Sequence, residues 1–393
     1  MKKLIAIAVV FVLAVGVAFA ADVSVDLIGN VDVLKGSSKD GDPVKAGGGF
    51  GRVRIGAEGQ NDDGNFGGWL RYDTGWDGNG GTSAGTVTGW GFAWWKPLDI
   101  LKIQIGSNPD GHWGMDGVTR WGFYQVAGDT DVVSENWAWG ASFTEGFGAP
   151  GLYVSLQPIE PMEINVAVPI TDGWGGVAKD VYKKFYGQVS YNISSIGKVG
   201  VTYKSNTNEL SVNDDGDLVS SPGKLFGYFG LTAIENLGID LGVGYTLPLK
   251  DQVQLAGTTK KVEVSVNPPV AVGLGVNFTT GALGIKARVQ GIFGGSVTIA
   301  NNAVKNNTVF AADLLPSFEV TDTVKAYLST GLQMTSYAAD GVDSTVAWHI
   351  EPYVSVKANA WAPNFYAGIR FQGDGTGDKI TEWSVPIGIW FSF

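Results

Sequence analysis

The C-terminal segment, residues 381–393, alternates between apolar side chains and mostly small or polar ones. Successive side chains of a β-strand point to opposite faces, so one face of this segment would be apolar along its whole length. The apolar positions are Trp383, Val385, Ile387, Ile389, Phe391 and Phe393. In water such a strand would invite pairing with other copies and aggregation. In a closed barrel that crosses a bilayer, its apolar face meets lipid and both edges are hydrogen-bonded, so the segment predicts a strand of a transmembrane β-barrel.

This ending resembles that of the bacterial outer-membrane β-barrel family, whose members commonly finish on an aromatic-rich strand with a terminal Phe. The resemblance implies that the apolar positions act as a C-terminal signal for the barrel assembly machinery. It also implies that the mature protein lies among the lipids of the outer membrane of a double-membraned bacterium.

The first 20 residues have the three parts of a secretory signal peptide. Met1–Lys3 is basic, Leu4–Val17 is apolar, and Ala18–Ala20 offers small residues around a cleavage site. The apolar run is shorter than the roughly 20 residues that a helix needs to span a bilayer. We therefore expect export and cleavage, with residues 1–20 removed and residues 21–393 forming the barrel. The chain has no Cys, which excludes a lipoprotein anchor and disulfide bonds.

Composition supports a membrane barrel of one continuous architecture. The chain has 58 Gly, 14 Trp, 13 Tyr and 19 Phe, and 17% of its residues are charged. An ordinary globular domain carries about 25% charged residues. Trp and Tyr favour the headgroup zone of a bilayer. The formal net charge of −11 argues against nucleic acid as a partner, and no linker-like stretch divides the chain.

Segments of alternating hydrophobicity, each about ten residues long, follow one another through the mature chain, separated alternately by short turns and longer polar loops. Clear examples are Gly51–Ala57, Leu101–Ile105, Leu237–Tyr245 and Leu283–Val289. They predict an all-β fold, a transmembrane antiparallel up-and-down barrel of about 16 to 18 strands with both ends on one rim. Residues 135–146 fit either a strand or part of the longest loop.

An internal repeat predicts where several hairpin turns lie. Each copy is an acidic turn followed at once by an alternating strand. The copies are Pro97–Ile105, Pro158–Val166, Ala233–Leu241 and, more loosely, Val320–Leu328. Their spacing is uneven, which disfavours a solenoid and favours hairpins separated by loops of unequal length. We expect these turns on one rim and the long polar loops on the other.

Most of the arginines alternate with apolar residues in these segments, so they face away from the apolar side. They are Arg52, Arg54, Arg71, Arg288 and Arg370. An arginine that faced lipid at the bilayer midplane would cost about 2 to 4 kcal/mol. The pattern therefore predicts a water-filled interior lined by these five side chains.

The long loop at residues 108–149 carries many acidic residues. Its charged residues include Asp110, Asp116, Arg120, Asp129, Asp131 and Glu135. This arrangement resembles the general diffusion porins, which fold one long acidic loop into the barrel opposite a ladder of arginines. The resemblance implies that the loop narrows a channel for small polar solutes or ions, and that the protein forms a homotrimer. The alternative is a solvated surface loop.

The sequence offers no catalytic or metal-binding signature. Only His112 and His349 could activate a nucleophile, and no serine lies in a recognisable catalytic turn. The acidic turns at 213–217 and 373–378 lack the ligand spacing of an EF-hand and are interpreted as solvated loop tips. We therefore predict no enzyme activity, no cofactor and no metal.

Two other functions stay open beside a passive pore. One is a non-transporting surface barrel, such as an adhesin or a structural outer-membrane protein. The other is a sugar-selective channel, because tryptophan rings can stack on sugars. The candidates for stacking are Trp90, Trp94, Trp95, Trp113, Trp137 and Trp139. Trp90 and Trp94 share their strand face with Phe92, and we expect all three in the lipid-facing girdle.

Overall fold

The computed structural model describes most of the chain after the predicted signal peptide. The described residues are 21–39, 43–46, 49–77, 86–107, 112–114, 144–146, 151–169, 185–204, 223–254, 261–299, 302–305, 308–337, 343–357, 359, 363–373 and 381–392. The predicted signal peptide lies outside them, and the first strand starts at Ala21. None of the described segments is a helix long and apolar enough to span a membrane.

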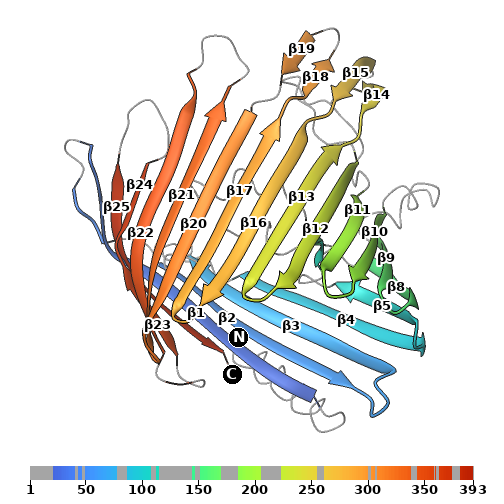
Figure 1. Cartoon of the computed structure of the whole chain (residues 1–393), viewed down its shortest axis with the longest axis horizontal. Helices are drawn as coiled ribbons and strands as arrows, with labels where there is room; N and C mark the ends of the chain where they lie inside the picture. The colour runs from blue at the N-terminus through green and yellow to red at the C-terminus, as the bar shows by residue number, and fades with distance from the viewer. Residues whose placement is uncertain are drawn as a thin grey trace.

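One large antiparallel sheet forms the wall of the molecule. Its strands are β1 (Ala21–Ser37), β2 (Gly49–Gln60), β3 (Phe66–Asp77), β4 (Thr86–Leu98), β5 (Leu101–Ser107), β8 (Gly151–Ile159), β9 (Met162–Pro169), β10 (Tyr186–Ile193), β11 (Gly197–Lys204), β12 (Lys224–Ile234), β13 (Leu237–Thr246), β16 (Val270–Thr280), β17 (Leu283–Phe293), β20 (Thr308–Thr321), β21 (Val324–Ser336), β22 (Thr345–Lys357), β23 (Asn364–Gly368), β24 (Arg370–Gly373) and β25 (Glu382–Ser392). Each strand pairs with the next along the chain, as Figure 1 shows.

The sheet closes on itself, because β25 pairs with β1 from Asp26↔Ser392 to Ser37↔Glu382. β23 and β24 are two parts of one wall strand, interrupted at Ile369, and both pair with β22 and β25. The wall is therefore a closed barrel of 18 strands, which decides between the predicted 16 and 18. Closure leaves no sheet edge whose backbone groups would need water.

The internal repeat marks hairpin turns, as predicted. The four copies place two turn residues between Leu98↔Leu101, Ile159↔Met162, Ile234↔Leu237 and Thr321↔Val324. In each copy the first turn residue is acidic and exposed, and the register shifts just before the turn. Extra residues of this kind are β-bulges, which bend and twist a strand locally. These turns share one end of the barrel, hereafter the short-turn rim.

The two faces of the wall differ as a membrane barrel requires. Large apolar side chains of one face are exposed, among them Val201 and Val243, both 51% exposed. Alternate positions on the same strands, such as Thr202 and Gly244, are buried. In β25 the predicted apolar positions from Trp383 to Phe391 pair with β1 on the outer face, while Ser384, Pro386 and Gly388 are buried. Phe393 lies outside the described residues, and the assembly signal stays a prediction.

Two connections that the sequence predicted to be polar loops are ordered into a second sheet. Its strands are β14 (Leu249–Gln254), β15 (Lys261–Asn267), β18 (Ser296–Ile299) and β19 (Asn302–Lys305). β15 and β18 belong to different loops and pair from Val264↔Ile299 to Asn267↔Ser296. Val262, Val264 and Val266 of β15 are buried, which is the alternation of a half-covered strand. The sheet stands at the end of the barrel opposite the short-turn rim (Figure 1).

Two further short strands lie in the long acidic loop. β6 (His112–Gly114) pairs with β7 (Thr144–Gly146) as a separate two-stranded sheet. Residues 144–146, part of the ambiguous segment 135–146, therefore belong to the loop and not to the barrel wall.

The assignment of the two faces predicts that a charged side chain on the outer face lowers the free energy of unfolding. Leu274 lies on the outer face of β16 and is 38% exposed. In Leu274→Arg we expect the free energy of unfolding to fall by about 2 to 4 kcal/mol, because the guanidinium must enter lipid. The measurement is urea-induced unfolding of protein refolded in lipid vesicles.

Thr279→Arg is the matched control, since Thr279 lies on the opposite face of the same strand beside the turn at Gly281. Its expected effect is within about 0.5 kcal/mol, as for an ordinary solvated position. Equal losses in the two variants would contradict the assignment of faces.

Candidate functional site

Three charged side chains of β2 and β3 meet on the inner face of the barrel. Arg54 Nε donates to Asp73 Oδ1 at 3.0 Å, and Arg71 Nη2 donates to Asp73 Oδ2 at 2.6 Å. Arg54 and Asp73 are direct cross-strand neighbours, and Arg71 precedes Asp73 by two positions on the same face. One carboxylate thus holds two guanidinium groups.

Two more ion pairs lie farther round the wall. Arg288 of β17 donates through Nε to Asp313 Oδ2 of β20 at 3.0 Å, and its Nη2 binds the same oxygen. Arg370 of β24 donates through Nε to Glu351 Oε2 of β22 at 2.9 Å. All four residues lie on the inner face of the wall and are buried by their neighbours. Each buried arginine therefore has its counter-charge on a nearby strand, which is how a charge away from bulk water is kept stable.

A glycine brings the neighbouring polar groups close together. Asp313, Gly331 and His349 lie opposite one another on β20, β21 and β22. A Cβ on Gly331 would lie 2.5 Å from His349 Cε1 and 2.8 Å from Asp313 Oδ1, so a larger residue would displace one of them. Ser329 Oγ and His349 Nε2 are hydrogen-bonded at 3.1 Å. His349 thus belongs to a buried polar network of the wall, with Ser329 as a partner that the sequence did not indicate.

Uncharged polar side chains form a buried network on another part of the inner face. Asn165 Nδ2 donates to Gln188 Oε1 at 3.1 Å, and Gln188 Nε2 donates to the Tyr228 hydroxyl at 2.8 Å. These residues of β9, β10 and β12, together with Thr202 of β11, are at most 3% exposed. Asn165 Oδ1 and Thr202 Oγ1 are buried and have no hydrogen-bond partner among the described residues. Glu351 and Arg370 on the other part of the inner face are equally buried, so neighbouring side chains shield one another all round the wall.

A polar recess of about 320 Å³ lies where the barrel closes, between β1, β24 and β25. Lys35 and Lys45 are paired through their backbones, and Lys35 is opposite Ser384. The recess is also lined by Arg370 and by the acidic residues Asp32 and Glu382. A bulge in β1 between Asp32 and Leu34 adjoins it, and bulges commonly redirect side chains.

Aromatic residues of β4 face the interior, against our prediction of a lipid-facing girdle. Trp94 is only 5% exposed and lies over Gly67, where a Cβ would meet its ring at 2.3 Å. Phe92 stacks on Trp69. Trp69 lies two positions before the inward Arg71 on β3 and therefore also faces inward. Trp95 is the outward neighbour and is 54% exposed. The prediction was wrong because the outward positions of β4 are mostly small, among them Gly89, Gly91 and Ala93, so the more apolar face of this strand is the inner one.

Solved structures share this architecture over nearly the whole chain. OccK9 (OpdG) of Pseudomonas aeruginosa matches with a TM-score of 0.55 at 10% identity, covering 95% of this chain and 98% of that one. OpdK of the same organism, solved with vanillate, matches with a TM-score of 0.52 at 9% identity over 95% and 99% of the chains. OmpT, an outer membrane protein of Vibrio cholerae, matches at 12% identity over 95% and 97%, with a TM-score of 0.49.

The chain has the fold of a bacterial outer-membrane porin. No model of a protein family and no curated protein matches it. At these identities the similarity to solved structures establishes the fold, and the predicted outer-membrane barrel is confirmed at that level.

Within the porin fold, the predicted site residues divide into two groups. Arg54, Arg71, Arg288 and Arg370 lie on the inner face of the wall and are ion-paired. The backbone of Arg52 in β2 is opposite Ile28 of β1 and Gly75 of β3, and its side chain is not among those that the structure describes. The residues predicted for the constriction, Asp110, Asp116, Arg120, Asp129, Asp131 and Glu135, lie outside the described residues.

The sequence reasoning missed the acidic partners Asp73, Asp313 and Glu351. Asp73 was within reach of the argument that found the arginines, because it shares a strand face with Arg71. Asp313 and Glu351 become partners only through the register of their strands. In the described part of the chain, no cluster of His, Asp and Glu could hold a metal ion.

Because Arg54 and Arg71 share the carboxylate of Asp73, we predict that replacing Asp73 changes the ion selectivity of the channel. In Asp73→Asn, Arg54 and Arg71 lose their common counter-charge, so we expect the reversal potential in a salt gradient to shift toward anions. Loss of charge-assisted hydrogen bonds should also lower the free energy of unfolding by about 1.5 to 3 kcal/mol.

Asp322→Asn removes the same charge from an exposed turn and serves as the control. It should leave both quantities nearly unchanged. A shift of equal size in the two variants would mean that the guanidinium groups near Asp73 do not face the conducting path.

Proposed function

We propose that the protein is an outer-membrane porin, a passive water-filled channel for small hydrophilic solutes and ions. The observation that carries this proposal is the row of charged side chains on the inner face of a closed barrel whose outer face is apolar. A solute-sized lumen is expected for a barrel of about 16 to 18 strands, since smaller barrels fill their interior with side chains. Charged rings that line such a lumen order water and select ions.

The long acidic loop, residues 108–149, is proposed to fold into this lumen. Cα atoms of β6, within the loop, come within 8 Å of β11, although β8, β9 and β10 separate β5 from β11 in the wall. Two buried polar atoms of β9 and β11 that lack a partner among the described residues support the same position, because a loop that lies against them could bind them. Asn165 Oδ1 and Thr202 Oγ1 would then find partners in the loop.

The position of the loop also supports a transverse electric field. β11 and β25 are half a circumference apart in the ring of 18 strands. The basic side chains of Lys35 and Arg370 lie beside β25, and Arg54 lies on β2, so an acidic loop held near β11 would face them across the pore. The wall arginines are already paired with Asp73, Asp313 and Glu351, so the field would come from the net charge of both walls and not from isolated arginines.

The predicted homotrimer, the contact with the assembly machinery and the cleaved signal peptide stay predictions. OpdK, whose fold is similar, is solved with vanillate, which supports small-solute binding in this barrel type. The second candidate, a non-transporting surface barrel, is favoured by the ordered sheet β14–β15–β18–β19, since a stable surface at the loop end could bind a partner.

Conductance of purified protein in planar bilayers tests the proposal. We expect stable open steps for the unmodified protein, and silence would favour the surface barrel. Replacing Asp116, Asp129 and Asp131 by Asn should move the reversal potential toward anions, because the loop then carries less negative charge in the lumen. Unchanged reversal potentials would remove the acidic loop from the conducting path.

The position of the loop has a separate test by crosslinking. The chain has no Cys of its own, so any crosslink must join the two introduced cysteines. We expect Gly114→Cys with Thr202→Cys to be joined by a short thiol-reactive crosslinker, because Cα atoms of β6 and β11 come within 8 Å of each other. Gly114→Cys with Val201→Cys is the control, because Val201 faces outward and is 51% exposed. Equal crosslinking of both pairs would contradict a loop bound inside the barrel.

A further inference from the structure

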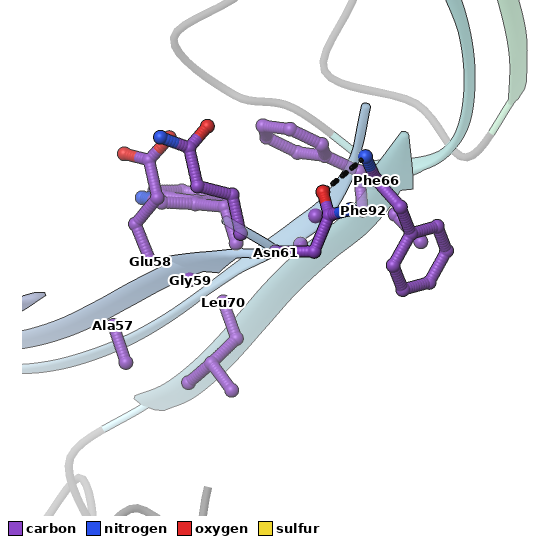
Figure 2. Close-up of a pocket in the computed structure, with 12 residues that line it drawn as sticks. Ala57, Glu58, Gly59, Asn61, Phe66, Leu70 and Phe92 are labelled. Carbon is purple, nitrogen blue, oxygen red and sulfur yellow. Dashed lines mark hydrogen bonds between the residues drawn. The ribbon is translucent and has the colours of Figure 1, made fainter. Parts of the chain in front are cut away.

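Four side chains form a row across the inner face of β1 to β4, close to the short-turn rim. Asp22 is opposite Glu58, Glu58 is opposite Trp69, and Trp69 is opposite Phe92. Direct cross-strand neighbours share a face, so the row presents two carboxylates beside two aromatic rings. Figure 2 shows Glu58 and Phe92 on one side of the sheet and Ala57 and Leu70 on the other.

The two rings of this row stack on each other, and the pair is hereafter called the platform. The ring centroids of Trp69 and Phe92 are 5.3 Å apart and their planes differ by 27°. Both side chains are partly exposed. The adjoining Trp94 is buried over Gly67, with Lys96 Nζ at 5.3 Å and Lys102 Nζ at 5.0 Å from its ring centroid. Trp94 is therefore the buried member of this aromatic row, and Trp69 and Phe92 are its partly exposed members.

Polar groups surround the platform and are available to a ligand. Asp22, Glu58 and Gln60 are exposed, and within the described part of the chain their side chains take part in no hydrogen bond. Glu58, Trp69 and Phe92 also contribute to a cavity of about 290 Å³, but Ala57, Phe66 and Leu70 of the outer face line it as well, so this cavity is not a recess of the lumen. The ligand-accessible groups of the inner face are therefore the exposed side chains of the row itself.

We propose that this platform binds a neutral sugar ring as it passes through the channel. The apolar face of the ring would stack on Trp69 and Phe92, and its hydroxyl groups would donate to the carboxylates of Asp22 and Glu58. The charges favour a neutral ligand over an organic cation, because Lys96 and Lys102 balance the two carboxylates. The inference rests on the proposed channel, since a solute reaches this wall only through the lumen.

The test is block of single-channel current by maltose added to either side of a planar bilayer. We expect brief, concentration-dependent closures with the unmodified protein. Trp69→Ala and Phe92→Ala should each weaken the block about tenfold, the effect of losing roughly one stacking contact. Trp69→Phe keeps a ring and should retain most of the block. The matched control is Trp95→Ala, which removes an outward ring from the same strand as Phe92 and should leave the block unchanged.

The possible outcomes separate this inference from the channel itself. Open steps of normal conductance in the variants show that they fold, so a selective loss of block supports the platform. Stable openings without any maltose block, or equal block by a polyethylene glycol of similar mass, would overturn the sugar site and leave the channel standing. Block by tetraethylammonium in place of maltose would also overturn it. Silence of the unmodified protein would overturn the channel and the sugar site together.

Discussion

Every feature of this molecule depends on the pairing of its first and last wall strands. Hydrocarbon offers no partners for backbone N–H and C=O groups, so a sheet can cross a membrane only if it has no edge. The long antiparallel pairing of β1 with β25 provides that closure. Once the ring is closed, the alternation of side chains within each strand sends apolar groups to lipid and leaves the other face for charges, glycines and aromatic rings.

The inner wall shows how a protein holds many charges away from bulk solvent. Asp73 binds two arginines, while Asp313 and Glu351 bind one each, and each acid lies on the same face as its partner. Removing one member of such a pair costs much more than the pair contributes, because the remaining charge keeps its desolvation penalty. The arginines are thereby fixed in position, as a charged wall that orders water and solutes requires.

Much of this architecture could be predicted from sequence, because it follows from a period of two and from turn chemistry. The alternation around Arg54 and Arg288 indicated their face, and the acidic repeat indicated the turns at Asp99 and Glu235. The partner of Arg288, Asp313, could not be predicted, since it depends on the register between β17 and β20. The alternation of Val262, Val264 and Val266 was present in the sequence but was interpreted as part of a polar loop. Trp94 fits on the inner face because Gly67, which is opposite it on β3, has no side chain. This contact between strands cannot be inferred from the alternation within one strand.

The sheet β14–β15–β18–β19 joins two connections that are separated along the chain by β16 and β17. Its central pairing, β15 with β18, means that neither hairpin has its native shape alone. An antibody raised against a peptide from one hairpin would thus meet half of a folded surface, whereas one selected on the intact barrel would recognise a discontinuous epitope. Variation in one hairpin is likewise constrained by its neighbour, so insertions that keep this pairing should accumulate beyond β14 and β19, at the margins of the sheet.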